Sequence, residues 1–286
     1  VWTEPGEDRL GRATTFVGYA VDAGRGWTAE RLPCGWPEIA ARVDCSSPTV
    51  AVDAAGLVHV VVVAAGAAGA DIVHHARPAA GGRWTAGLRV NDGGDGVRRS
   101  GPVAVADALG QLHVAWADGG DGRSEVRYRQ RLADGSWRDV STINEPAAGA
   151  QTAPALVLAA DGTVHAAWRD DRDGLPAIWT SMLPERSFVW WPDARISAAG
   201  HAAAGPPVVA AAANGDVVAA WVSRDGDGGA ALHGARRPAA GPYWDPSRAV
   251  DVQALGPLGA LALAPRPDGR FVLAWTEGRP ADVWRL

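Results

Sequence analysis

The residues best suited to chemistry lie at the ends of short apolar stretches and in the polar loops that follow them. Three of these stretches end in a tryptophan with an acidic residue two positions later, and arginines follow in the loops. Carboxylates and guanidinium groups hydrogen-bond to sugar hydroxyls, and an aromatic ring packs against the apolar face of a pyranose. The candidate ligand-binding residues are Trp116, Asp118, Arg123, Trp168, Asp170, Arg172, Trp221, Arg224, Trp275 and Glu277.

Each of these residue types also has a structural role. Large aromatic side chains dominate buried area, so core packing is favoured over ligand stacking for the tryptophans. An aspartate beside glycine often accepts hydrogen bonds from backbone N–H groups, and this role stands beside ligand binding for the carboxylates. Arginines in such loops are also ordinary solvated surface. Both kinds of role stay open at the level of sequence.

The apolar stretches belong to an internal repeat. A glycine turn is followed at a fixed distance by an apolar strand, and successive glycines are 52 to 54 residues apart. The β-rich residues before each glycine predict a hairpin with a glycine turn. The five copies are GLVHVVV, GQLHVAW, GTVHAAW, GDVVAAW and GRFVLAW, starting at Gly56, Gly110, Gly162, Gly215 and Gly269.

Two further strands follow each hairpin, so the period contains four. Four strands in about 50 residues are typical of a propeller blade. Both faces of a single blade would be exposed to water, and stacking against neighbouring blades buries them. We therefore predict an all-β propeller formed as one domain by residues 1–286. Five blades are favoured, with the ring closed by pairing N- and C-terminal strands, and six blades are the alternative.

The sequence resembles a known repeat family. The phrase HVAW, the Gly/Asp loop after it and the turn ADGSW resemble the sialidase-type, Asp-box repeats of secreted bacterial propellers, over most of the chain. The Asp-box turn survives as DAGRGW, AAGGRW, LADGSW and AAGPYW, whereas PERSFVWW has lost it. The catalytic set of sialidases, with three arginines, a tyrosine–glutamate pair and an acid aspartate, cannot be placed. The resemblance therefore implies the fold and a lectin-like rather than catalytic protein.

Charge and hydropathy restrict the partners. The chain has 27 basic and 32 acidic residues, a net charge of −5, and all the basic residues are arginine. Because it has no cationic field, nucleic acid and anionic membrane surfaces are poor partners. No apolar run approaches the ~20 residues of a membrane-spanning helix, so membrane insertion is not expected.

The cysteines and the acidic loops carry two further expectations. Cys34 and Cys45 are close enough in sequence for a disulfide in an oxidising compartment, although two thiols are the alternative. The loops at Asn91, Gly119, Asp170 and Arg224 have the oxygen density of a Ca²⁺ site but lack the EF-hand spacing. We expect no cofactor, with Ca²⁺ as the metal to consider. A histidine repeated in three copies indicates a structural role and not zinc.

Similar blades with repeated aromatic, acidic and arginine positions suit multivalent binding more than catalysis. The leading hypothesis is a secreted, lectin-like propeller that binds extracellular glycans through its strand-end loops. A sialidase-like glycoside hydrolase or lyase is one alternative. A protein-interaction scaffold, joined to other domains or subunits of a secreted assembly, is the other. The copy at Gly56 has Val62 in place of tryptophan and is expected to have lost the site.

Overall fold

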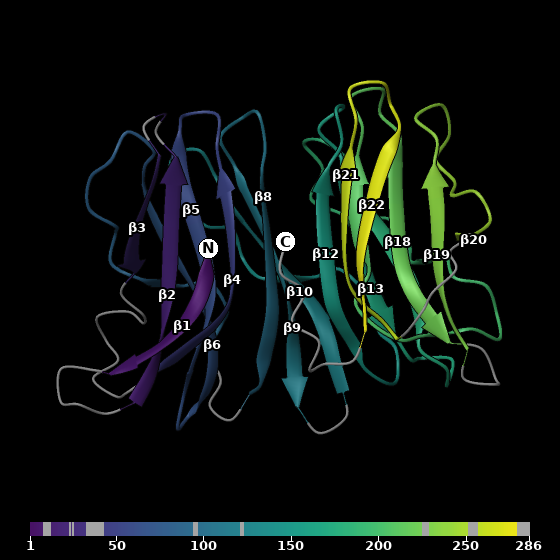
Figure 1. The fold of residues 1–286 in the computed structure, drawn as a ribbon, viewed down its shortest axis with the longest axis horizontal. Helices are drawn as coiled ribbons and strands as arrows, with labels where there is room; N and C mark the ends of the chain where they lie inside the picture. Colours follow the sequence, from purple (N-terminus) through teal and green to yellow (C-terminus); the bar gives the residue numbers. More distant parts are fainter. Residues whose placement is uncertain are drawn as a thin grey trace. The chain divides into compact units, whose positions relative to one another are not determined.

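The computed structural model describes residues 1–7, 13–22, 24, 26–32, 43–93, 97–120, 123–224, 229–250 and 257–278. Every regular element in these ranges is a β-strand (Figure 1). The chain divides into two compact units, Val1–Asp121 with Val126–Thr142, and Gly122–Glu125 with Ile143–Leu286. Each unit is described by itself.

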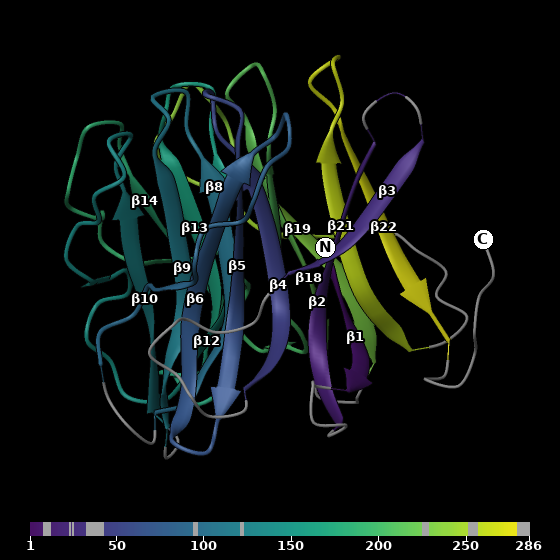
Figure 2. The same ribbon diagram turned by 90° about the vertical axis from the view of Figure 1, so that its left-hand side faces the viewer.

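The first unit contains three antiparallel sheets whose strands follow chain order. Figure 2 shows the strands β4, β5 and β6 running alongside one another. The sheets are β1 (Trp2–Glu7), β2 (Ala13–Asp22) and β3 (Trp27–Leu32); β4 (Asp44–Val52), β5 (Leu57–Gly66), β6 (Gly69–Pro78) and β7 (Leu88–Arg89); and β8 (Arg99–Ala106), β9 (Leu112–Gly120), β10 (Arg123–Arg131) and β11 (Ser141–Thr142).

The second unit also contains three antiparallel sheets. In its middle sheet the first strand is split, because β16 and β17 both pair with β18 on either side of a Gly-Pro-Pro segment. The sheets are β12 (Gln151–Leu158), β13 (Val164–Asp170), β14 (Ala177–Leu183) and β15 (Ala194–Arg195); β16 (Ala202–Ala203), β17 (Val208–Ala211), β18 (Val217–Arg224), β19 (Ala230–Arg237) and β20 (Arg248–Val250); and β21 (Leu258–Pro265) with β22 (Phe271–Glu277).

These sheets match the four-strand period of the sequence, and the predicted all-β fold is confirmed. Three sheets have four strands in sequence order, here called strands A to D as in a propeller blade. The number of blades, the closure of the ring and the single domain over residues 1–286 stay predictions.

The five glycines of the repeat lie in equivalent hairpin turns. Each has a φ between 75° and 86°, the left-handed region that glycine enters without a Cβ penalty. In the first turn Gly56 N–H donates to Asp53 O, and Asp53 N–H donates to Leu57 O. The Asp53 carboxylate also accepts the N–H groups of Ala55 and Leu57 at 2.9 and 2.8 Å. This is the three-residue hairpin loop with a left-handed final residue.

A second repeated feature is a β-bulge near the start of strand A. The pairing register shifts between Ser46 and Thr49, between Ser100 and Val103, and between Thr152 and Ala155. The residue inside each bulge has a positive φ and precedes a proline; these residues are Ser47, Gly101 and Ala153, with φ of 50°, 57° and 52°. A bulge adds one residue to its strand, so it determines which strand-A residue faces the end of strand B.

The core lies between stacked sheets. In β5 consecutive residues are buried, and alternate residues join different hydrophobic clusters. Val60 and Val62 pack with Val17 of β2, whereas Val61 packs with Trp116 of β9. Because successive side chains of a strand point to opposite faces, the sheet β4–β7 is covered on both faces within the first unit. This is the stacking that a blade requires.

In the second unit, the sheets β12–β15 and β16–β20 bury a comparable cluster. Trp221 packs there with Ala167 and Ile178. Strand D is short, and the second residue after it replaces a backbone partner: the Ile178 N–H donates to Ser197 Oγ at 2.9 Å, as the Ile72 N–H donates to Asn91 Oδ1 at 2.7 Å in the first unit. A polar residue just beyond strand D therefore completes the hydrogen bonding of strand C.

The buried histidines make the folded state sensitive to acid. Burial lowers the pKa of His165 from 6.5 to about 4. Below pH 6.5 the unfolded chain binds a proton that the folded chain does not, so the free energy of unfolding falls as pH drops towards 4. We expect His165 alone to account for a loss of about 2 kcal/mol by pH 5.

The variant His165→Val tests this expectation by urea unfolding at several pH values. Val218 and Val272 occupy the same repeat position, so valine is compatible with the strand. The variant should lose less stability than the parent between pH 7 and pH 5. An identical pH dependence in both proteins would contradict the assignment.

Candidate functional site

The tryptophan and acidic residue at the end of strand B form a hydrogen-bonded pair. Residues two apart in a strand lie on the same face, so the indole N–H can reach the carboxylate. Nε1 donates to the acid at 3.1 Å from Trp116 to Asp118, at 2.9 Å from Trp168 to Asp170 and at 2.8 Å from Trp275 to Glu277. The two-residue spacing of tryptophan and acid, which suggested a ligand site, therefore also produces a repeated hydrogen bond within the sheets.

The strand-A residue opposite the acid differs among the sheets. Arg99 is paired with Asp118 and Gln151 with Asp170, so both positions of these pairs are polar. The other sheets place Cys45 opposite Ala64, Ala203 opposite Ser223 and Leu258 opposite Glu277. Two sheets, β8–β11 and β12–β15, thus form polar clusters at this end of their strands.

In the first cluster, the Arg99 guanidinium is bound by acceptors from the protein itself. Arg99 Nε donates to Asp118 Oδ2 at 2.9 Å, Nη1 donates to Ala70 O and Asp71 Oδ1, and Nη2 donates to Asp92 O. All three guanidinium nitrogens have acceptors, and 4% of the side chain is exposed. Arg99 therefore joins the sheets β4–β7 and β8–β11 and has little to offer a ligand.

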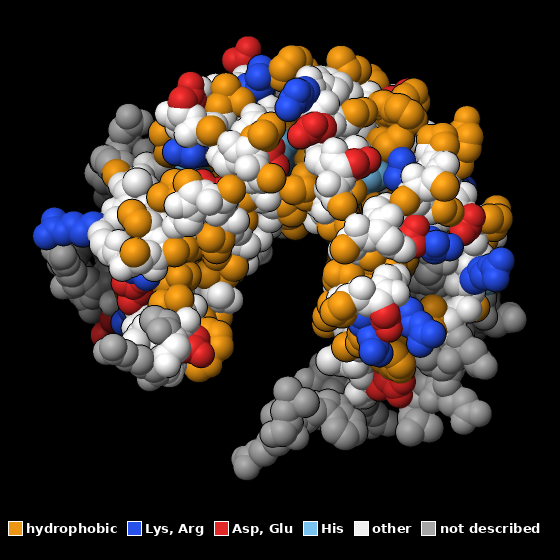
Figure 3. All heavy atoms as spheres, turned by 90° about the horizontal axis from the view of Figure 1, so that it is seen from above, with side chains coloured by type: hydrophobic (Ala, Val, Ile, Leu, Met, Phe, Trp, Pro, Cys, Tyr) orange, Lys and Arg blue, Asp and Glu red, His pale blue; other side chains and the backbone are white. Residues whose placement is uncertain are grey.

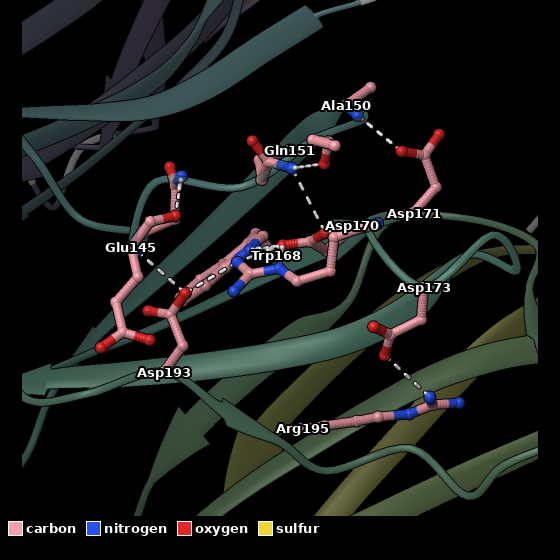
Figure 4. A network of polar contacts seen from close by, with 12 residues as sticks. Glu145, Ala150, Gln151, Trp168, Asp170, Asp171, Asp173, Asp193 and Arg195 are labelled. Atoms are coloured by element: carbon pink, nitrogen blue, oxygen red, sulfur yellow. Dashed lines mark hydrogen bonds and ion pairs between the residues drawn. The ribbon is translucent and has the colours of Figure 1, made fainter.

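The second cluster is centred on Arg172, in the loop between β13 and β14. Figure 4 shows its neighbours Trp168, Asp170 and Asp193. Arg172 Nε and Nη2 donate to Asp170 Oδ2 at 2.9 and 2.6 Å, and Nη2 also donates to Asp193 Oδ2 at 2.7 Å. Its guanidinium stacks on Trp179, with Cζ 4.2 Å from the ring centroid. The Gln151 amide donates to Asp170 Oδ1 at 3.3 Å. We call Gln151, Trp168, Asp170, Arg172 and Asp193 the Arg172 cluster.

Sheet register explains why these residues meet. Gln151 is opposite Asp170, and Trp168 is opposite Trp179, which is in turn opposite Arg195 of β15. Asp193 lies just before β15, and its carboxylate reaches Arg172 Nη2. Strands A to D thus bring side chains from four separate segments to one face of the sheet.

Arg172 differs from Arg99 in having a donor to spare. Its Nη1 has no hydrogen-bond partner among the residues that the structure describes, and 12% of the side chain is exposed. Two carboxylates and an aromatic ring hold the guanidinium, so its free edge is fixed in position. A pre-positioned planar donor of this kind recognises hydroxyl or carboxylate oxygens.

The two carboxylates around Arg172 have pKa values shifted in opposite directions. Burial by itself raises the pKa of Asp170, but hydrogen bonds from Arg172 and Trp168 outweigh it and hold the pKa below its usual value. Burial raises the pKa of Asp193, and the hydrogen bonds from Arg172 and the Glu145 N–H offset only part of this effect. Asp193 Oδ1 is buried and has no hydrogen-bond partner in the described part of the chain.

A segment before β12 covers the cluster. The Glu145 N–H donates to Asp193 Oδ2 at 2.9 Å, and the Ala150 N–H donates to Asp171 Oδ1 at 2.5 Å. The Gln151 amide also donates to Ala148 O at 3.2 Å. Residues 145–150, here called the strap, are therefore fastened at both ends to the loops that carry Arg172 and Asp193.

The predicted ligand-binding tryptophans need a correction. Trp116, Trp168 and Trp221 are 0 to 1% exposed and pack in the sheet core, so they offer no ring face for stacking. Trp275 is half-buried and donates to Glu277, which is also half-buried. Core packing explains the three buried tryptophans.

The remaining predicted residues fall into two groups. Asp118 is engaged by Arg99 and Trp116, and Asp170 and Arg172 form the cluster described above. Arg123 and Arg224 are exposed at the start of β10 and the end of β18 and do not join either cluster. The copy at Gly56 has Val62 and Ala64 at the tryptophan and acid positions, both buried. A ligand-binding role for the named residues stays a prediction.

Sequence reasoning missed Gln151, Asp193 and the strap. Gln151 gives no chemical signal of its own, because its role comes from the pairing register of β12 with β13. Asp193 belongs to the string WPDARIS, which leads into β15 and does not by itself indicate a partner of Arg172. Its position just before a strand that pairs with β14 was the available signal.

The metal and disulfide expectations are only partly covered by the structure. In the described ranges no group of three or more His, Cys, Asp or Glu side chains could hold a metal ion. The acidic loops at Asn91, Gly119 and Arg224 each include residues outside those ranges. Cys45 is buried and disulfide-bonded, whereas Cys34 lies outside the described residues, so their pairing stays a prediction.

The surface carries both signs of charge. Figure 3 shows arginine and acidic side chains interspersed with hydrophobic ones on the face drawn, without a continuous basic area. Among the described residues, no helix is long and apolar enough to cross a membrane.

Comparison with known proteins supports the fold. No protein-family model and no curated protein sequence matches the chain. Among solved structures it is similar to the Hadza microbial sialidase Hz136, with a TM-score of 0.57 and 16% identity over 81% of this chain and 52% of that one. The chain thus spans about half the length of this sialidase.

Two further structures are similar to the chain. A protein of unknown function from Dyadobacter fermentans has a TM-score of 0.57 and 13% identity over 82% of this chain and 76% of that one. Polysaccharide lyase Uly1 has a TM-score of 0.55 and 12% identity over 95% of this chain and 78% of that one. At these identities the similarity concerns fold alone, and it supports a β-propeller-like architecture.

The strap provides a test of how tightly the cluster is covered. Gly149 has a φ of 82°, and a Cβ on it would lie 2.2 Å from Asp171 Oδ1. Gly174 has a φ of 91° but open space around its Cβ position. We expect Gly149→Ala to lower the free energy of unfolding by about 1 kcal/mol more than Gly174→Ala, because both variants have the backbone strain and one adds a clash.

Thermal or urea unfolding of the two variants measures this difference. Equal losses of stability would show that the strap is not held against Asp171 in the folded protein.

Proposed function

We propose that this protein is a carbohydrate-binding, lectin-like propeller that acts outside the cell. The observation that carries the proposal is the Arg172 guanidinium, fixed by Asp170, Asp193 and Trp179 with its Nη1 edge unpartnered in the described chain. A rigid planar donor loses little side-chain entropy when it binds a sugar hydroxyl. The Asp193 carboxylate lies beside it and also accepts the Glu145 N–H.

Two other features support the proposal. The fold is similar to that of a sialidase and of a polysaccharide lyase, whose names refer to carbohydrates, although a shared fold is weak support for a shared ligand. The disulfide-bonded Cys45 agrees with an oxidising compartment and so with a secreted protein.

The number of sites is a separate part of the proposal. The sequence repeat suggested several equivalent sites, but every guanidinium nitrogen of Arg99 has an acceptor, whereas Nη1 of Arg172 has none among the described residues. We therefore place the site for which the structure offers most support in the sheet β12–β15. Multivalent binding would then require further sites, and the binding stoichiometry measures the number of sites per chain directly.

A glycoside hydrolase or lyase is the second candidate. Asp170 and Asp193 accept hydrogen bonds from the same Nη2 atom, and their pKa values are shifted apart. Paired carboxylates with divergent pKa values are the usual acid and base of glycosidases. Asp170 accepts hydrogen bonds from Gln151, Trp168 and Arg172, however, so it is held as a structural acceptor and is not free to exchange a proton with a substrate. Binding is therefore the favoured function.

A glycan array followed by titration calorimetry tests the proposal. We expect saturable binding without turnover, weakened about tenfold by Arg172→Lys, because lysine keeps the charge but loses the planar donor edge. The matched control Arg186→Lys changes an exposed arginine in the turn after β14 and should bind normally.

Three other outcomes would overturn or redirect the proposal. Equal weakening by both variants would remove Arg172 from the site. Product release from an aryl glycoside panel, abolished by Asp193→Asn, would favour the hydrolase. Silence across the array would leave the protein-interaction scaffold as the remaining hypothesis.

A further inference from the structure

The unpaired oxygen of Asp193 indicates more about the ligand than that it is a sugar. Asp193 shares Arg172 with Asp170, so one guanidinium serves two buried carboxylates. The side chain of Asp193 is 0% exposed, and its Oδ1 has no partner in the described ranges. A buried acceptor without a donor costs free energy, which a ligand that supplies a donor would recover.

Glu145 brings a second acidic group to this point. Its backbone N–H is bonded to Asp193 Oδ2, so the strap brings Glu145 to the edge of the Arg172 cluster (Figure 4). The negative charge of Glu145 contributes to the raised pKa of Asp193, after the larger effect of burial. Among the residues that the structure describes, the Glu145 carboxylate has no cationic partner, and Arg172 contacts only the Oδ2 atom of Asp193.

The wider surroundings are also acidic. Asp171 accepts a backbone N–H group from the strap, and Asp173 pairs with Arg195 at 3.2 Å. The segments 145–150, 170–173 and 193–195, which carry these groups, contain more carboxylates than guanidinium groups; the carboxylates are Glu145, Asp170, Asp171, Asp173 and Asp193, and the guanidinium groups are Arg172 and Arg195. This balance disfavours an anionic ligand and favours a cationic one.

We propose that Asp193 Oδ1 and the Glu145 carboxylate bind the ammonium group of an amino sugar, while Arg172 Nη1 donates to a neighbouring hydroxyl. An ammonium group has three donors in a compact head, which matches two carboxylate acceptors, whereas a sialic acid or uronate carboxylate would be repelled. This inference rests on the proposed carbohydrate-binding function and specifies its ligand as cationic saccharide.

Calorimetric titration of the whole chain with three oligosaccharides tests the inference. The probes are a glucosamine tetrasaccharide, its fully N-acetylated counterpart of matched shape, and a galacturonic acid tetrasaccharide, at about pH 6 and at low and high salt. We expect the glucosamine probe to bind about tenfold more tightly than the acetylated one at low salt, with the advantage shrinking at high salt.

The variant Glu145→Gln removes one charge from an exposed side chain and keeps the backbone bond to Asp193. It should abolish the preference for glucosamine over its acetylated form. The control Glu185→Gln removes an exposed charge from the turn after β14 and should keep the preference. A preference that survives Glu145→Gln would overturn the assignment.

The other outcomes distinguish failure of this inference from failure of the proposed carbohydrate-binding function. Preferential binding of the galacturonic acid probe would overturn the cationic ligand and leave a carbohydrate-binding protein. If none of the three probes binds while the array identifies another saccharide, the inference alone falls. If the array is silent as well, the proposed function falls with it. Calcium binding that depends on Glu145 would replace the ammonium site by a metal site.

Discussion

The structure of the Arg172 end of the sheet depends on how a buried carboxylate is neutralised. A carboxylate that leaves water without partners is expensive, so each acid at the end of strand B must gain donors. The preceding tryptophan supplies one through its indole N–H, and strand A supplies another where it has a polar residue. Asp170 needs Arg172 as well, and this requirement brings the loop after β13 over Trp179 and against Asp193.

The sequence predicted the parts of this arrangement that are local. A glycine at a fixed distance before an apolar strand determined the hairpins, and the two-residue spacing of Trp168 and Asp170 already placed both on one face. The partners from other segments were not predictable. Gln151 faces Asp170 because a bulge at Ala153 sets the register of β12, and Asp193 is 21 residues from Arg172 along the chain.

The two polar clusters look alike in sequence but differ in the hydrogen-bond partners of their arginines. Asp118 and Asp170 follow a tryptophan by two residues, yet Arg99 distributes its donors over two sheets while Arg172 keeps Nη1 free of described partners. Repeated residues therefore build the fold, and departures from the repeat build the candidate site. The proposed site consists of what one sheet adds to the repeated pattern, namely Arg172 beside Asp193, the strap and Glu145.

The central claim is that Asp170 and Arg172 act as one interacting unit, and a double-mutant cycle of unfolding free energies tests it most directly. Asp170→Asn and Arg172→Met should each cost about 3 kcal/mol, because each leaves a buried charge without its partner. The double variant should cost at least about 2 kcal/mol less than the two losses together. Additive losses would contradict the account, because Arg172 would then be held by something other than the carboxylates around it.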